Sequence, residues 1–451
     1  MPDRHCPNSP GGHATHDELH RSLGLTDAVV IGLGSMLGAG IFVALAPAAH
    51  AAGSGLLIGL AVAAVVAYCN ATSSARLAAL YPASGGTYVY GRARLGDFWG
   101  YIAGWGFVVG KTASCAAMAL TIGAYVLPSR AHEVAVAAVA ALTLVNYFGI
   151  KKSAWLTRLI VIVVLAVLAA VVTSVVASEG VSVARLAIPS TVSAAGISQA
   201  AGLLFFAFAG YARIATLGEE VRDPTRTIPR AIPMALGITL VVYAAVAVAV
   251  LSALGPQRLA ASTAPLSDAV RFSGAWWMVP VVALGAAVAA VGSLLALILG
   301  VSRTSLAMAR DGHLPHLLAA VHPRYQAPHR SELTIGVAVA LLAAFTDIRG
   351  AIGFSSFAVL SYYAVTNASA LTLRTEEGRP PRLIPVVGLI GCVLLGISMP
   401  RPSVTAGITV LLIGVFYYVT RTALAHKSTR IQLDPDQDAP RRGKKSSAGE
   451  T

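Results

Sequence analysis

Charged side chains are scarce in this chain of 451 residues. Asp, Glu, Lys and Arg together make up 12% of it, whereas hydrophobic residues make up 56%. A soluble domain usually has about 25% charged residues. So few charges cannot cover a surface that faces water on all sides, and the composition therefore predicts a protein that lies in lipid.

Signatures of several other classes are also missing. The four cysteines, at 6, 69, 115 and 392, form no CxxC pair, and no HExxH, GxSxG or Walker pattern occurs. These absences argue against a disulfide framework, a metal or cofactor centre, a membrane enzyme and an ATP-driven pump. The N-terminus lacks the pattern of a signal peptide. Its histidines stand among Pro and Gly, which favours a disordered segment over residues 1–26 and disfavours a metal site: His5, His13, His16 and His20.

Apolar runs dominate the rest of the chain. A helix needs about 20 apolar residues to cross the hydrocarbon core. Twelve runs meet or approach that length and predict an all-α polytopic membrane protein with 12 transmembrane helices. They lie near 27–51, 54–80, 98–127, 132–149, 154–178, 195–218, 230–254, 275–303, 333–346, 351–373, 384–399 and 404–421.

Basic residues give the formal net charge of +13, but they stand in short gaps between apolar runs. That placement is typical of membrane orientation and not of nucleic-acid binding. With the N-terminus inside, Lys and Arg concentrate in the cytoplasmic loops. The sequence thus predicts a plasma-membrane protein with both termini cytoplasmic, and a disordered basic tail at 422–451 that rests on anionic lipid. The opposite loops hold Arg130, Arg185, Arg258, Arg271, Arg349 and Arg401.

Glycines crowd the centre of the first apolar run, at Gly32, Gly34, Gly38 and Gly40. Each glycine weakens a helix by about 1 kcal/mol relative to alanine. One interpretation is a broken helix at Gly38-Ala39-Gly40, whose freed N–H groups need a partner in lipid. The alternative is a close helix contact, since Gly34 and Gly38 form a GxxxG pair.

The sixth run repeats the feature, because Gly210 falls in its middle. Five spans separate the two runs, and an odd number of spans inverts the second unit relative to the first. Paired interruptions in inverted units point to a binding site at the membrane midplane, where half-helix N-termini would face a carboxylate. Phe208, beside this break, is a candidate for a hydrophobic gate over the site, with ordinary packing as the alternative.

Four segments in order resemble the amino acid–polyamine–organocation permeases, which are similar in fold to the sodium-coupled leucine transporter. The resemblance covers roughly residues 22–421 and is closest in wording to the cationic amino acid transporter branch. The segments that carry it are Gly34 to Phe42, Tyr81 to Tyr90 with Gly104-Trp105, Phe205 to Gly210 with Glu219 to Pro229, and Met308 to Pro315 with Pro323 and Pro328.

The resemblance implies a 5+5 inverted repeat, with broken helices 1 and 6. The first repeat would cover 27–178 and the second 195–373, with two extra helices at 384–421. It implies a secondary transporter for an amino acid or related amine that works by alternating access, without cofactor, metal or nucleic acid. The implied substrate-binding residues are Ser35, Gly38, Ala39, Gly40 and Ile41 in the first run, and Ala207, Phe208 and Gly210 in the sixth.

Two departures bear on the coupling ion. Some proton-coupled relatives carry a Lys in the fifth helix, where this chain has an apolar residue, about Val164. The eighth run offers a single hydroxyl, Ser293, where a sodium site usually has two. Sodium coupling is therefore disfavoured, Ser293 is a weak candidate ligand, and coupling to protons or exchange is expected.

Lys111 lies about 14 residues from either end of the third run, roughly 20 Å from each surface at 1.5 Å per residue. Its side chain cannot snorkel that far, and exposing the charge to lipid would cost about 3 kcal/mol. One hypothesis makes it a proton-coupling or substrate-contacting group, which would favour a neutral or acidic substrate. The alternative is a structural Lys bonded to carbonyls of a broken helix. A sensor or structural subunit without turnover is the alternative function.

Overall fold

The computed structural model describes residues 23–433, apart from 82–84, 149–153, 216–220 and 326. In these ranges the chain is helical and has no β-strand beyond an isolated bridge between Leu23 and Val221. Lipid offers backbone groups no hydrogen-bond partner, so a spanning chain must pair them within helices. The histidines and Cys6 of the N-terminal segment lie outside the described residues.

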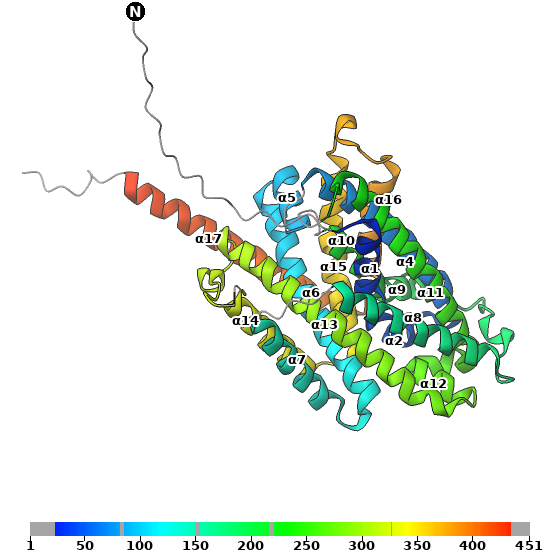
Figure 1. Ribbon diagram of the computed structural model, residues 1–451. Helices are drawn as coiled ribbons and strands as arrows, with labels where there is room; N and C mark the ends of the chain where they lie inside the picture. Colours follow the sequence, from blue (N-terminus) through cyan, green and yellow to red (C-terminus); the bar gives the residue numbers. More distant parts are fainter. Residues whose placement is uncertain (1–22, 82–84, 149–153, 216–220, 326, 434–451) are drawn as a thin grey trace, which may run out of the picture.

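The helices before residue 180 cover the first five predicted runs. The first run is divided into three pieces, α1 (Leu25–Met36), α2 (Gly40–Val43) and α3 (Leu45–Ala52). The others are α4 (Leu56–Leu80), α5 (Thr87–Leu95), α6 (Asp97–Val126), α7 (Ala131–Tyr147) and α8 (Ala154–Val176). The short α5 lies in the connection between α4 and α6 (Figure 1).

The remaining helices begin with a second divided run: α9 (Ala194–Phe208), the 3₁₀ turn η4 (Ala209–Tyr211) and α10 (Ala212–Ala215). Then come α11 (Pro224–Ala261), α12 (Pro265–Phe272), α13 (Val279–Arg310), the 3₁₀ turn η6 (His316–Ala319) and α14 (His329–Phe345). The chain ends with α15 (Ile348–Leu371), α16 (Leu383–Ile397) and α17 (Arg401–Leu433).

Each of the twelve predicted runs contains helix in the described residues, and nine of the helical segments described there are long and apolar enough to cross a membrane. The helix α16 is apolar but has only 15 residues. The helices α7 and α14 have 17 residues each and lie side by side (Figure 1). The chain is therefore a multi-pass helical membrane protein, and the count of twelve spans stays a prediction.

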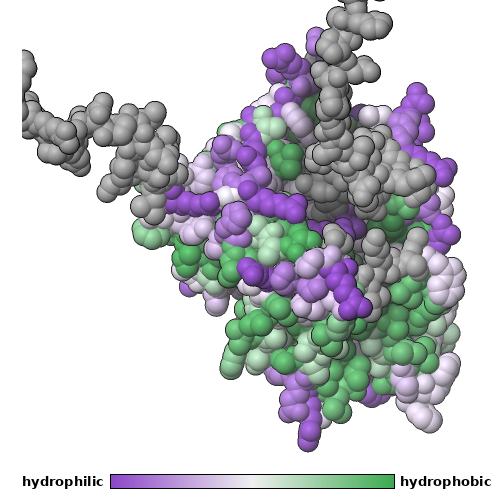
Figure 2. All heavy atoms as spheres, turned by 60° about the vertical axis from the view of Figure 1, so that its left-hand side comes forward, coloured by the Kyte–Doolittle hydropathy of each residue, from purple (hydrophilic) through white to green (hydrophobic). Residues whose placement is uncertain are grey.

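The outer surface of the helices is apolar. Large side chains such as Val241 (69% exposed), Phe345 (84%) and Phe416 (72%) face outward. Apolar surface left in water costs about 25 cal/mol per Å², a cost that lipid removes. Figure 2 shows hydrophobic residues spread over the lower part of one face, with hydrophilic residues concentrated above them. The pattern fits a belt of lipid around the bundle.

Two boundaries differ from the prediction of disordered ends. Leu23 already pairs with Val221, and α1 begins at Leu25, so residues 23–26 belong to the folded part. At the other end α17 runs to Leu433, twelve residues beyond the predicted span limit of 421. Residues 422–433 contain neither Gly nor Pro, and Pro435 restricts the residue before it, which explains the helix end there.

Candidate functional site

The two interrupted helices touch at their breaks. A Cβ atom added to Gly210 would lie 2.2 Å from the backbone oxygen of Ser35, and one added to Gly40 would lie 2.7 Å from Cα of Ala207. A third contact joins Gly38 to Ser293 of α13, whose Oγ would lie 2.2 Å from an added Cβ. Only glycine permits these approaches, so the glycines serve close packing and the helix breaks at the same time.

Carbonyl groups released at the breaks are satisfied by buried side chains from other helices. The Tyr243 hydroxyl of α11 bonds with the carbonyl oxygens of Met36 and Ala207, at 3.1 Å from the latter. Tyr125 of α6 donates to the carbonyl of Phe42 at 2.7 Å. Lys111 Nζ donates to the carbonyl of Ala209 at 3.2 Å. An unpaired buried carbonyl would cost about 1–3 kcal/mol, so these three donors stabilise the interrupted geometry.

The backbone N–H groups at the first break, unlike the carbonyl groups, have no side-chain partner among the described residues. Gly38 and Ala39 are buried, yet neither N–H donates a hydrogen bond among those found in the described residues. Buried backbone N–H groups in native structures are almost always paired. Two adjacent unpaired donors inside the bundle therefore mark a place that a polar ligand or water can fill.

A cavity of about 160 Å³ borders this region, between α1, α6, η4 and α13. Ser35, Lys111 and Gly210 lie in its wall beside the breaks, and it extends toward Arg303 and Ala307 near the end of α13. None of the described lining residues is Asp or Glu. Besides these five, the wall contains Gly85, Phe107, Ser114, Met118, Phe206, Ala209, Arg213, Ser293, Ala296, Leu297, Gly300 and Thr304.

Not all predicted substrate-binding residues reach the cavity. Ser35, Gly210, Lys111 and Ser293 line it, whereas the other predicted residues are not among its lining residues in this conformation: Gly38, Ala39, Gly40, Ile41, Ala207 and Phe208. Phe208 is fully buried and packs on Tyr243, with ring centroids 5.1 Å apart. Phe206, two residues earlier, lines the cavity in this conformation, together with Phe107 of α6. The gate assignment to Phe208 stays a prediction.

Ser293 and Lys111 were the predicted coupling residues. The Ser293 hydroxyl donates to the carbonyl of Gly34 at 3.5 Å, a long contact. Lys111 is 6% exposed and makes the bond to Ala209 that its structural alternative requires. A role of either residue in coupling stays a prediction.

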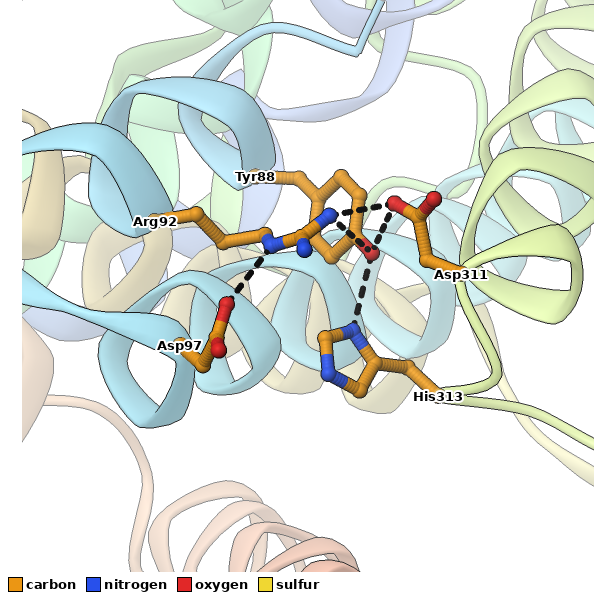
Figure 3. Close-up of polar contacts among 5 residues, drawn as sticks. All are labelled: Tyr88, Arg92, Asp97, Asp311 and His313. Atoms are coloured by element: carbon orange, nitrogen blue, oxygen red, sulfur yellow. Dashed lines mark hydrogen bonds and ion pairs between the residues drawn. The ribbon is translucent and has the colours of Figure 1, made fainter.

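A polar network closes the end of the bundle where α13 stops. It joins α5, the start of α6 and the loop after α13 (Figure 3). The Tyr88 hydroxyl donates to Asp311 at 2.6 Å, and His313 Nδ1 lies 2.8 Å from the same hydroxyl. Arg92 pairs with both Asp97 and Asp311. Burial, and then the bond to Asp311, raise the pKa of Tyr88 above its ordinary value.

The network makes stability depend on pH through His313. Burial, and then the positive charge of Arg92, lower the pKa of His313 below its ordinary value of about 6.5. The folded state therefore binds this proton less readily than the unfolded chain, so stability falls as the pH drops from about 6.5 through the folded-state pKa. We expect a lower melting temperature in detergent at about pH 5.5 than at about pH 7.5, and a smaller difference in His313→Gln.

Exposed His316, three residues later, supplies the control for this measurement. His316→Gln should leave the pH difference in place. An equal reduction in both variants would contradict the role assigned to His313.

Residues 23–425 match the amino acid permease family. The chain belongs to this family. The match confirms the resemblance to amino acid–polyamine–organocation permeases that the four motifs carry. An uncharacterized transporter of Mycobacterium tuberculosis (strain ATCC 25618 / H37Rv) is 72% identical over 91% of this chain and 94% of its own length.

More distant relatives of this permease have named substrates. The branched-chain amino acid permease BcaP of Bacillus subtilis (strain 168) is 26% identical, over 89% of this chain and 92% of its own. Cationic amino acid transporter 4 of Homo sapiens is 28% identical, over 80% of this chain and 61% of its own. The printed names differ in substrate class, so they do not choose one for this permease.

Sequence patterns missed several residues of the permease that matter at the site. Tyr125 and Tyr243 support the breaks. Tyr243 is the single Tyr in its predicted run, whereas Tyr125 shares its run with Tyr101. Arg303 fell at the predicted end of the eighth run, but α13 continues to Arg310 and places it at the cavity. Glu332 fell just outside the predicted run 333–346, but α14 begins at His329 and buries it.

Proposed function

We propose that this permease is a secondary transporter that moves an amino acid across the plasma membrane by alternating access. The observation that carries the proposal is the pair of unpaired, buried N–H groups of Gly38 and Ala39 at the helix break. Two adjacent donors suit a carboxylate, the group that all amino acids share. The break belongs to a segment that contacts α9 and α13, so rearrangement of those helices would alter the site.

The charge of the cavity supports a neutral or acidic substrate. Lys111 and Arg303 lie in its wall, and the described lining residues include no carboxylate. A cationic substrate would meet like charge there, which is costly in a low-dielectric site. An acidic side chain would be attracted, and a neutral one would be tolerated by Phe107, Met118, Phe206 and Leu297.

The proposed topology has both termini in the cytoplasm and two inverted units of five helices. The interruptions in α1–α3 and in α9–α10 support the two units, because they fall at corresponding places five spans apart. With this orientation the end of the cavity at Arg303 and Ala307 faces the cytoplasm. The structure then corresponds to an inward-facing conformation.

Counterflow in liposomes tests the proposal. Purified protein is reconstituted and preloaded with unlabelled alanine, leucine, glutamate or arginine, and entry of the labelled form is measured. We expect labelled alanine, leucine or glutamate to accumulate, and arginine to give the weakest signal. The same amino acid should raise the melting temperature in detergent, because a ligand that binds only the folded state stabilises it.

A sensor or structural subunit would behave differently in this assay. It would show the thermal shift without counterflow. Counterflow of arginine without any for the other three amino acids would contradict the assigned substrate class.

A further inference from the structure

Glu332 is a fully buried carboxyl group without a hydrogen-bond partner. It lies in the first turn of α14, its exposure is 0%, and neither side-chain oxygen has a partner among the described residues. Burying an ionised carboxylate without donors costs many kcal/mol, whereas a protonated carboxyl avoids most of that cost. The geometry of this conformation therefore suits the neutral, protonated form.

One charged side chain acts on this carboxyl, Arg303 of α13. In the described structure Glu332 and Arg303 form no ion pair, and Arg303 lines the cavity. Because α13 packs against α14, a rearrangement of these helices would let the two groups pair. The cation that acts on the carboxyl thus lies at the same cavity that borders the helix breaks.

The elements packed against α14 carry other ionisable groups. They include Tyr147 on α7, His316 on η6, His329 and Arg330 on α14 itself, and Lys111 on α6, which is bonded to Ala209. None of these forms a hydrogen bond or an ion pair with the Glu332 carboxyl in the described structure. Arg303 is therefore the group that can stabilise an ionised Glu332.

Unpartnered polar atoms also occur where α7 meets α14, and on α13, which packs against both helices. The Thr143 hydroxyl of α7 is buried without a partner and lies against Gly336, one turn after Glu332 on the same face of α14. On α13 the Ser302 hydroxyl, next to Arg303, is also buried without a partner. Native structures pair most buried polar atoms, so this contact fits a region that gains water or new partners in another conformation.

We propose that Glu332 binds the proton that is coupled to transport. It takes up the proton from water on the outer side of the membrane and holds it in this conformation. It releases the proton to cytoplasmic water through the cavity when Arg303 pairs with its carboxylate, and no other atom is exchanged. The inference rests on the proposed function, because it requires a carrier that changes conformation.

Glu332→Gln tests the inference, since Gln keeps the shape of the protonated carboxyl but cannot release a proton. Liposomes carrying wild-type or variant protein are compared for uptake of labelled alanine, leucine and glutamate, with and without an inward proton gradient. We expect the stimulation by the gradient to fall by about tenfold or more, while counterflow, which needs no net proton movement, stays measurable. Glu133→Gln, in the exposed first turn of α7, is the matched control and should keep the stimulation.

Stimulation of wild-type size in Glu332→Gln would overturn the inference and leave transport established. Absence of counterflow in the wild-type protein would contradict the proposed function instead. If Glu332→Gln does not fold, Arg303→Gln replaces it. Loss of the cation should move the half-maximal pH of uptake upward, and an unchanged profile would overturn the inference.

Discussion

Gly210→Ala is expected to abolish transport and to lower the melting temperature of the permease. The added Cβ would lie 2.2 Å from the oxygen and 2.4 Å from the carbonyl carbon of Ser35, and 2.7 Å from the N of Met36. All three atoms are backbone, so no side chain can rotate away. The two interrupted helices must move apart, and overpacking of this kind typically costs about 1–3 kcal/mol.

Separation of the breaks would also disturb the polar contacts that hold them. Tyr243 bonds with Met36 on one interrupted helix and Ala207 on the other, so it requires the present spacing. Lys111 depends on the position of Ala209, the residue before Gly210. Transport measured by counterflow should therefore fall by about tenfold or more, beyond what the loss of stability explains.

Gly237→Ala is the matched control for this substitution. Gly237 lies inside α11, is exposed, and has no heavy atom within 4 Å of an added Cβ. Alanine is favoured over glycine in a helix by about 1 kcal/mol, so this variant should be at least as stable as the wild type. Normal counterflow in Gly210→Ala would contradict the contact between the breaks as a functional requirement.

Apolar runs in the sequence predicted the helices because a chain that crosses lipid must pair its backbone N–H and C=O groups within helices. In the described residues each predicted run contains helix, and the two glycine-centred interruptions occur at Leu37–Ala39 and at Ala209–Tyr211. Glycine in the middle of a lipid-crossing helix predicts the position of such an interruption, since the residue both weakens the helix and permits close contact.

Partners of the breaks could not be predicted in the same way. Tyr243 is 36 residues from Ala207 along the chain, and Lys111 is 98 residues from Ala209. Such pairs depend on how the helices pack and on the rotation of each about its axis. The burial of Glu332 could not be predicted either, because α14 begins four residues before the predicted run and so contains a residue that the prediction placed just outside it.

Lys111→Ala is expected to lower counterflow by about tenfold or more. The substitution leaves the carbonyl of Ala209 without its donor inside the bundle, which costs about 1–3 kcal/mol and loosens η4 beside the cavity. Thr112→Val is the matched control. The Thr112 hydroxyl is buried next to Lys111 but bonds only within α6, to the carbonyl of Val108 at 2.7 Å, so its loss should leave transport close to the wild type.

The pH profile of the remaining uptake separates two hypotheses for Lys111. If Lys111 itself carries the coupled proton, uptake by Lys111→Ala should no longer respond to a proton gradient. If Glu332 carries it, the residual uptake should keep the wild-type pH dependence at a lower rate, and this is the result we expect. The ammonium of Lys111 already has an acceptor in Ala209, whereas the carboxyl of Glu332 has no donor among the described residues. The protonation of a buried group without a partner changes most when a conformational change alters its surroundings. We therefore assign the pH response to Glu332, and to Lys111 the hydrogen bond that links α6 with η4.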